Sequence, residues 1–139
     1  MADVAIAIRT YLLTKSTVTD IVGQRIYADM LPQNPTLPAV TFSKVSTSHD
    51  HTISNLAGLA HCRLQFDCYA TTRTTANEIC EVIRKCGVIT QKGTLSGVDV
   101  RGVRLEDGQR NFVEYTRDDS DDHRYVTNFD LAIDYAEDI

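Results

Sequence analysis

Apolar and polar residues alternate between Gly58 and Tyr69. The inward positions of this alternation are Cys62, Leu64, Phe66 and Cys68. The outward positions are Arg63, Gln65, Asp67 and Tyr69. A period of two residues is typical of a strand that buries one face. We therefore expect a central strand whose thiols and phenyl ring lie in the core.

After Ala70 the period changes to about 3.6 residues, which predicts a helix. The apolar stripe of this helix consists of Ala76, Ile79, Cys80 and Ile83. Thr71 or Thr72 can cap its first turn by accepting a hydrogen bond from an unpaired backbone N–H, and Gly87 can take the left-handed conformation that ends a helix. We expect the helix to fold back over the apolar face of the strand, so that the pair forms the core.

Two further helices are predicted near the N-terminus. Residues 3–14 place apolar side chains on one side of a helix, and Asp3 is suited to cap it. A second, short helix follows, in which Thr17 and Asp20 have the spacing of a capping box. We expect Gly23 to end this short helix.

The next segments predict strands and connectors. Arg25–Tyr27 can form a brief strand, and Leu31–Pro38 contains all three prolines of the chain. Because proline lacks a backbone N–H, we expect this proline segment to connect strands without regular hydrogen bonding. Ala39–Ser48 alternates and predicts another strand, while the polar His49–Ala57 segment predicts a long hairpin tip.

The C-terminal half predicts two more strands. Val88–Gly97 is expected to be a connector with a turn at Lys92-Gly93. In Val98–Glu106 the apolar phase slips by one residue at Gly102, which indicates a β-bulge. The charged segment Asp107–Asp122 predicts a mobile loop. The final strand has six inward positions, at Tyr125, Thr127, Phe129, Leu131, Ile133 and Tyr135.

Together these elements predict an α+β fold: a mostly antiparallel β-sheet with an N-terminal helix and one inserted helix packed on one face. The length of 139 residues favours a single domain, 1–139. The net charge is −5, and basic residues are scattered along the chain, which argues against an autonomous nucleic-acid-binding protein. The sequence offers no membrane-spanning run and no signal-peptide pattern, so we expect a reducing compartment.

The residues that commonly carry chemistry do not form a recognisable site. The four cysteines fall on apolar stripes or at a helix end, so we expect buried free thiols, although a cross-pair between strand and helix stays geometrically open. His49 and His51 lack a nearby third ligand. The aspartates around Ser120 lack the spacing of a calcium loop. We therefore predict no enzyme activity, and no catalytic, cofactor-binding or metal-binding residues.

Two sequence blocks are similar to motifs of a known family. Val22–Tyr27 (VGQRIY) is similar to a turn that precedes a proline-bearing link, and Gln65–Ala70 (QFDCYA) is similar to a strand that leads into a helix. With these blocks, the chain resembles the tail terminator (tail completion) family of long-tailed bacteriophages and prophages over nearly its whole length. Asp107–Asp122 departs from the family pattern, because it is longer and more acidic.

The resemblance implies a structural virion protein with no cofactor. Such a subunit assembles as a homo-hexameric ring on the head-proximal end of the tail tube, ends tube polymerisation, and joins the tail to the head. Its partners would be the tail tube protein and a head-completion or connector protein, with DNA passing through the lumen without specific binding and no membrane involved. Its place would be the tail or neck of the virion, after assembly in the cytoplasm of the bacterial host.

A cyclic ring needs two different contact patches on each subunit. We expect one patch at His49–Ala57 and the other at Gly108–Asp122, although both segments could equally be ordinary surface loops. The candidate interface residues are His49, Asp50, His51, Asn55, Arg110, Phe112, Tyr115, Arg117, Asp118 and Asp119.

Two alternatives to the terminator stay open at this point. The first is a different subunit of the phage neck, a head-completion or connector protein. The second is a small soluble enzyme that uses cysteine and histidine. Thiol labelling of the native protein separates the enzyme from the others, because a catalytic thiol reacts fast whereas buried thiols do not.

Overall fold

The structure is a computed structural model that describes residues 3–33, 35–51, 56–89, 93–95, 98–115 and 123–136. Its elements in chain order are α1 (Val4–Leu13), α2 (Ser16–Val22), β1 (Ile26–Ala28), β2 (Ala39–His51), β3 (Leu56–Ala70), α3 (Arg73–Ile89), β4 (Gly93–Leu95), β5 (Val98–Tyr115) and β6 (His123–Ala136).

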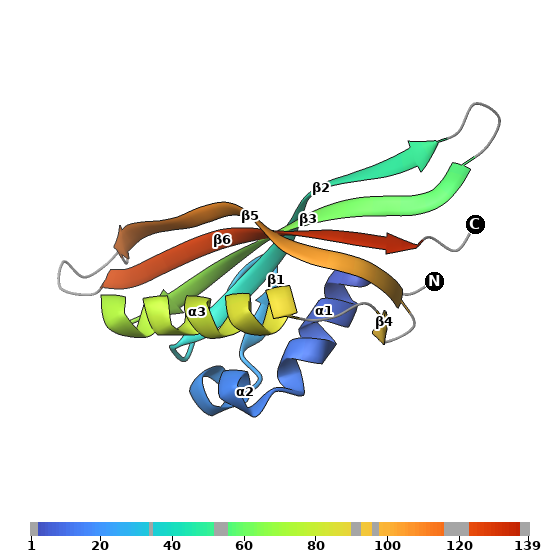
Figure 1. Ribbon diagram of the computed structural model, residues 1–139. Helices are drawn as coiled ribbons and strands as arrows, with labels where there is room; N and C mark the ends of the chain where they lie inside the picture. Colours follow the sequence, from blue (N-terminus) through green and yellow to red (C-terminus); the bar gives the residue numbers. More distant parts are fainter. Residues whose placement is uncertain are drawn as a thin grey trace.

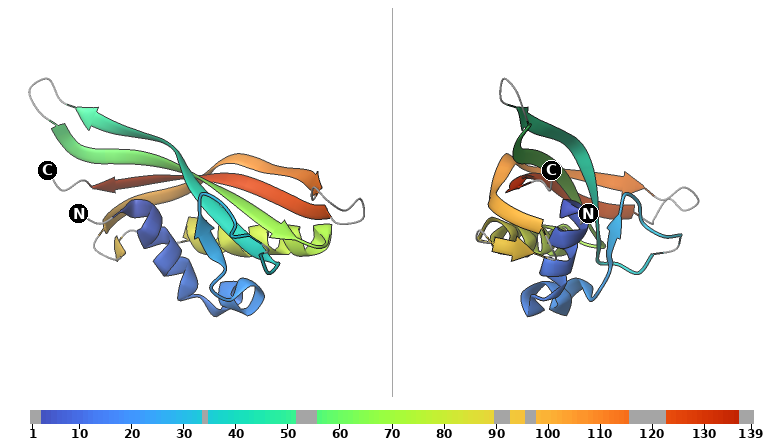
Figure 2. Two further views of the ribbon diagram at one scale, coloured as in Figure 1. Left: turned by 180° about the vertical axis from the view of Figure 1, so that it is seen from behind. Right: turned by 90° about the vertical axis from the view of Figure 1, so that its right-hand side faces the viewer.

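The described strands form one six-stranded sheet in the order β1-β2-β3-β6-β5-β4 (Figure 1). All neighbouring strands pair antiparallel except β1 and β2, which pair parallel. The described helices α1, α2 and α3 lie on the same side of the sheet (Figures 1 and 2). The predicted α+β fold is confirmed. We call the helix-covered side the inner face and the opposite side the outer face.

The core lies between the inner face and the helices. Phe66 of β3 stacks on Phe129 of β6, with ring centroids 5.4 Å apart, and both side chains are almost fully buried. The predicted inward positions of β3 and the predicted stripe of α3 are all buried. Burying one large apolar side chain stabilises a fold by about 1.5–3 kcal/mol, so this layer carries much of the stability.

Several local predictions are confirmed. The side chain of Asp3 accepts a hydrogen bond from the backbone N–H of Ala5 (2.8 Å) and caps α1. Thr72 caps α3, because its Oγ1 accepts from the backbone N–H of Thr75 (3.2 Å). Gly23 ends α2 with a φ of 59°, a value that glycine adopts without strain.

The two predicted helix boundaries at Gly87 and Thr17 are wrong. The described part of α3 runs to Ile89, because glycine permits the left-handed turn but does not impose it, and a helix continues through it at a cost of about 1 kcal/mol. Helix α2 begins at Ser16, with Lys15 as an N-cap that makes no side-chain hydrogen bond. The capping box is therefore absent, and the helix starts directly from the turn that ends α1.

The predicted lengths of the strands and loops also need correction. Strand β2 extends to His51 and β3 begins at Leu56, so the hairpin tip is shorter than His49–Ala57. Strand β5 extends to Tyr115, so the predicted loop is wrong for its first half, while residues 116–122 lie outside the described residues. The predicted connector Val88–Gly97 is wrong at its start, where α3 runs to Ile89, and at Gly93–Leu95, which forms β4. Lys92, in the predicted turn, lies outside the described residues.

The bulge predicted at Gly102 is confirmed. The register between β5 and β6 shifts between Val100 and Gly102, and it shifts again on both sides of Asp107. Each extra residue restores the phase between the strands and bends the longer one. The twisted sheet therefore ends in two hairpins, β2–β3 and β5–β6, which lie at opposite ends of the sheet (Figure 1).

Candidate functional site

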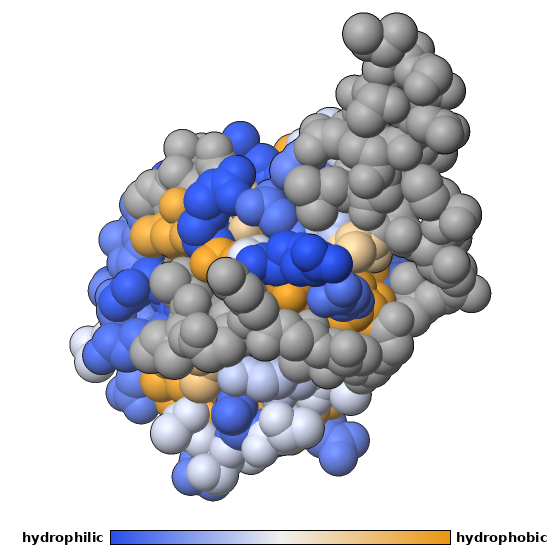
Figure 3. Space-filling view, turned by 45° about the vertical axis from the view of Figure 1, so that its right-hand side comes forward, coloured by the Kyte–Doolittle hydropathy of each residue, from blue (hydrophilic) through white to orange (hydrophobic). Residues whose placement is uncertain are grey.

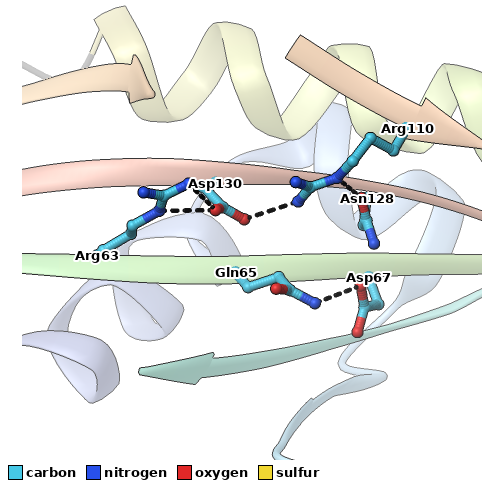
Figure 4. Close-up of polar contacts among 6 residues, drawn as sticks. All are labelled: Arg63, Gln65, Asp67, Arg110, Asn128 and Asp130. Carbon is cyan, nitrogen blue, oxygen red and sulfur yellow. Dashed lines mark hydrogen bonds and ion pairs between the residues drawn. The ribbon is translucent and has the colours of Figure 1, made fainter. Parts of the chain in front are cut away.

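The outer face carries a network of charged and polar side chains on the central strands (Figure 4). Asp130 of β6 lies at its centre, with a side chain only 4% exposed. Arg63 of β3 donates from Nε to Asp130 Oδ2 at 2.7 Å. Arg110 of β5 donates from Nη2 to Asp130 Oδ1 at 3.2 Å and from Nε to Asn128 at 2.7 Å. Two guanidinium groups from two strands therefore neutralise one buried carboxylate.

Strand pairing explains why these residues meet. Gln65 lies opposite Asp130 across β3 and β6. Arg110 lies opposite Asn128 across β5 and β6. Residues directly opposite in a sheet point to the same face, so Arg110 meets Asn128 directly and reaches Asp130 diagonally. Arg63 lies opposite Ala132 and also reaches Asp130 diagonally. The network thus depends on the register that the second pair of bulges in β5 sets.

Asp67 extends the network toward the end of β3. Burial raises the pKa of this carboxyl above its usual value. Hydrogen bonds from Gln65 and Asn128 and the charge of Arg110 oppose that effect without cancelling it. The amide of Gln65 lies 3.2 Å from Asp67 Oδ1. Ionised Asp67 is therefore less stable in the fold than in water.

Asp134 forms a second charged group nearer the other end of β6. His61 Nδ1 lies 2.6 Å from Asp134 Oδ1, and Arg104 Nη1 donates to Oδ2 at 2.8 Å. Partial burial works against ionisation of Asp134, but the hydrogen bond from His61 and the charge of Arg104 outweigh it and lower the pKa. The outer face thus holds two carboxylates, Asp67 and Asp134, whose pKa values shift in opposite directions.

Arg73, at the start of α3, joins the helix to the β5–β6 hairpin. Its guanidinium donates to the backbone oxygens of Val126 and Phe112, each at 2.8 Å. The same group lies 5.2 Å from the ring centroid of Tyr125. Arg73 therefore ties the start of α3 to both strands of the hairpin. Its place in the first turn of the predicted helix gives no sequence signal for this role.

The predicted interface residues divide between the two ends of the sheet. Arg110 and Phe112 have described side chains, which are 49% and 44% exposed. The backbones of His49, Asp50, His51 and Tyr115 lie in β2 and β5. Asn55, Arg117, Asp118 and Asp119 lie outside the described residues. The two patches stay a prediction, and their described parts lie at opposite ends of the sheet (Figure 2).

Both ends of the sheet also have long strand edges without a described neighbour. The three residues of β1 pair with β2 only up to Phe42, and β4 pairs with β5 only up to Val100. Exposed apolar side chains follow on both strands, namely Val45 on β2 and Phe112 and Val113 on β5. Edge strands with exposed apolar residues favour pairing with another chain.

The thiols show no arrangement for catalysis in the described structure. Cys62, Cys68 and Cys80 are buried, whereas Cys86 is half-buried, and all four are free. Burial raises the pKa of the Cys68 thiol, and Cys80 lies within hydrogen-bond reach of it. A raised pKa keeps a thiol protonated and unreactive. The described ranges contain no cluster of three potential metal ligands.

Within the described residues, no helix is long and apolar enough to cross a membrane. Among the described residues, neither the outer-face network nor the strand edges contain a group of three potential metal ligands.

Comparison with known proteins agrees with this geometry. A search of curated protein sequences finds no match. Among solved structures, the chain is similar to one from the virion of a native gene transfer agent (GTA) particle, with a TM-score of 0.67 and 15% identity over 94% of this chain and 93% of that chain. This likeness shows the fold. Residues 6–134 match the family described as tail completion protein gp17. The chain therefore belongs to the tail completion protein gp17 family, a family of structural phage tail proteins.

Proposed function

We propose that this protein is a tail terminator, which forms a ring on the head-proximal end of the phage tail tube. The ring ends polymerisation of the tube and joins the tail to the head connector. The family match over residues 6–134 carries this proposal, because it covers almost all of the described fold. The protein is then a component of the tail or neck of the virion, assembled in the cytoplasm of the bacterial host.

The two hairpin ends support assembly into a closed ring. A ring requires two different surfaces that fit each other. The β2–β3 and β5–β6 hairpins lie at opposite ends of the sheet (Figure 1). One carries exposed Val45 and the other exposed Phe112 and Val113. A ring in which one hairpin end contacts the other end of the next copy buries both apolar edges, and we expect six copies in it.

The outer face fits a surface past which DNA moves. Arg63, Arg104 and Arg110 each bind a carboxylate of the same chain. Lysine and arginine groups that are already paired contribute little to phosphate binding, which depends on the release of counterions from the DNA. A lumen lined by this face would let DNA pass without holding it.

A head-completion or connector subunit is the alternative within the virion. It would use the same ring-forming ends but would bind the portal side instead of the tube. A test of the proposal mixes the purified protein with growing tail tubes from the same phage. We expect shorter tubes with a capped end in electron micrographs. Unchanged tubes, together with binding to isolated portal rings, would favour the connector.

A further inference from the structure

A groove lies on the helical side of the molecule, where α1 and α2 meet the second half of α3. It has a volume of about 340 Å³ and is lined by Tyr11, Lys15, Thr17, Val82, Lys85 and Cys86. Its floor is mostly apolar, and Figure 3 shows apolar surface exposed beside polar residues in the lower, helical part of the molecule. Such a floor favours an apolar side chain from a binding partner.

Two ammonium groups border this floor. Lys15 Nζ lies 4.7 Å from the ring centroid of Tyr11, which holds it beside the groove. Lys85 is exposed one helical turn after Glu81, whose carboxylate is already bound by Arg84 at 2.6 Å. Within the described residues, no salt bridge joins either lysine to a carboxylate. The groove therefore offers one apolar site and two positive charges.

The sequence contains a segment with the complementary chemistry. Residues 137–139, Glu-Asp-Ile, follow β6 and combine two carboxylates with one branched apolar side chain. The segment 116–122, TRDDSDD, is more acidic but has no apolar side chain. The groove thus matches residues 137–139 in both charge and hydrophobicity, and it matches 116–122 in charge alone.

The position of the groove indicates that this segment comes from another copy. Strand β6 ends near the start of α1 or beyond it, whereas the groove lies at the opposite end of α1, where α1 meets α2 (Figures 1 and 2). From Asp3 to Tyr11 the helix alone spans about 12 Å, at roughly 1.5 Å per residue. Three residues reach at most about 10 Å, which is less than the length of α1 that separates the end of β6 from the groove.

We propose that Glu137, Asp138 and Ile139 of one copy dock in the α1–α2–α3 groove of a neighbouring copy. Ile139 fills the apolar floor, and the two carboxylates bind Lys15 and Lys85. This contact rests on the proposed ring, because it requires a neighbouring copy, but it requires no other property of the ring. It adds a tie between subunits that is separate from the two hairpin ends.

The test uses Cys86, which lines the groove and is the least buried of the four thiols. The host is the full chain with Glu137→Lys and Asp138→Lys, so that its own segment does not compete. The probe is the peptide DYAEDI, residues 134–139 of the native sequence. We expect millimolar peptide to slow labelling of native Cys86 by a disulfide reagent several-fold, and calorimetry to detect the same binding.

Matched controls separate the contribution of charge from that of the apolar side chain. A peptide with both acids changed to lysine should neither bind nor protect. Adding Lys15→Glu and Lys85→Glu to the host should exchange these results, so that only the lysine peptide binds. The peptide TRDDSDD should bind at least tenfold more weakly than DYAEDI.

Two results would overturn the inference. One is an absence of both protection and heat at millimolar DYAEDI. The other is equal binding of TRDDSDD, which would mean that the groove recognises acidity without the apolar residue. Neither result bears on capping of tail tubes, which is measured in a separate assay. Failure of the groove contact and failure of the terminator role are therefore distinguishable.

Discussion

The two faces of the sheet differ in how their side chains are stabilised. On the inner face, Phe66 and Phe129 stack under the helices, and burial alone explains their position. On the outer face, Asp130 is equally well buried, but only because two arginines from neighbouring strands bind it. The stability of the inner face depends on how well apolar side chains fill the core. The stability of the outer face depends on the strand register that brings the charged groups together. Disrupting one side chain on each face tests this difference.

The largest effect is expected on the inner face. Phe66→Ala should lower the free energy of unfolding by about 3–5 kcal/mol, from lost transfer energy and the cavity left behind. Gln65, its neighbour on the outer face, is the matched control, and Gln65→Ala should cost about 0.5–1.5 kcal/mol. Chemical denaturation measures both. A loss below about 1 kcal/mol for the phenylalanine variant would contradict the assigned core.

The centre of the outer network should give the next largest effect. Asp130→Ala leaves Arg63 and Arg110 without their shared acceptor and should cost about 1.5–3 kcal/mol, less than a fully buried pair because both guanidinium groups reach water. Arg101→Ala removes an exposed ion pair with Asp99 and should cost less than about 1 kcal/mol. Equal losses in the two variants would show that the network adds nothing beyond surface pairing.

The two shifted carboxyls should give opposite dependences on pH. The folded-state pKa of Asp134 lies below its unfolded value, so its stabilising contribution is present above pH 4 and is lost as the pH falls through the folded pKa. Asp134→Asn should therefore destabilise the protein at pH 7, and the difference from the native chain should shrink on acidification. Denaturation midpoints between pH 2.5 and pH 7 measure this.

Asp67 should show the reverse. Its folded-state pKa is raised, so ionisation costs stability as the pH rises past the unfolded value. Asp67→Asn keeps an acceptor for Gln65 and should stabilise the protein at pH 7, with the gain disappearing at acidic pH. A variant that is less stable than the native chain at pH 7 would show that burial does not dominate at this carboxyl.

The smallest effect on stability is expected at the β5–β6 tip. Deleting the run from Asp118 to Asp122 should change the free energy of unfolding by less than about 1 kcal/mol, because strand pairing resumes at His123. The same deletion should alter assembly into the proposed ring, measured by light scattering. Loss of the folded monomer would mean that the segment belongs to the core.

The sequence predicted the inner face better than the outer face for a physical reason. The burial of Phe66 and Cys68 follows from the two-residue alternation of apolar side chains, which is visible in a short stretch of the sequence. The partners of Asp130 come from β3 and β5, far apart in sequence, and no local pattern indicates them. The charges of residues 107–115 favour a solvent-exposed loop, yet Arg110 lies in β5 and binds Asn128 and Asp130 of the neighbouring strand β6.

For the candidate interface residues, the sequence indicates the two polar segments, His49–Ala57 and Gly108–Asp122. It does not indicate that the described parts of these segments belong to strands. The family motifs at Val22–Tyr27 and Gln65–Ala70 indicated the relationship that the family match now shows. The sequence pattern underestimates the lengths of β2 and β5, because pairing with β3 and β6 supports polar residues that have little strand propensity of their own. Pairing between distant segments therefore sets the length of both hairpins.

The most direct test of the terminator role is the length of tail tubes from host cells that produce the phage with and without this protein. With the protein absent, the proposal predicts overlong tubes of variable length and no joined heads, and supplying the protein should restore uniform, capped tubes. Tubes of normal length in its absence would contradict the role of ending polymerisation.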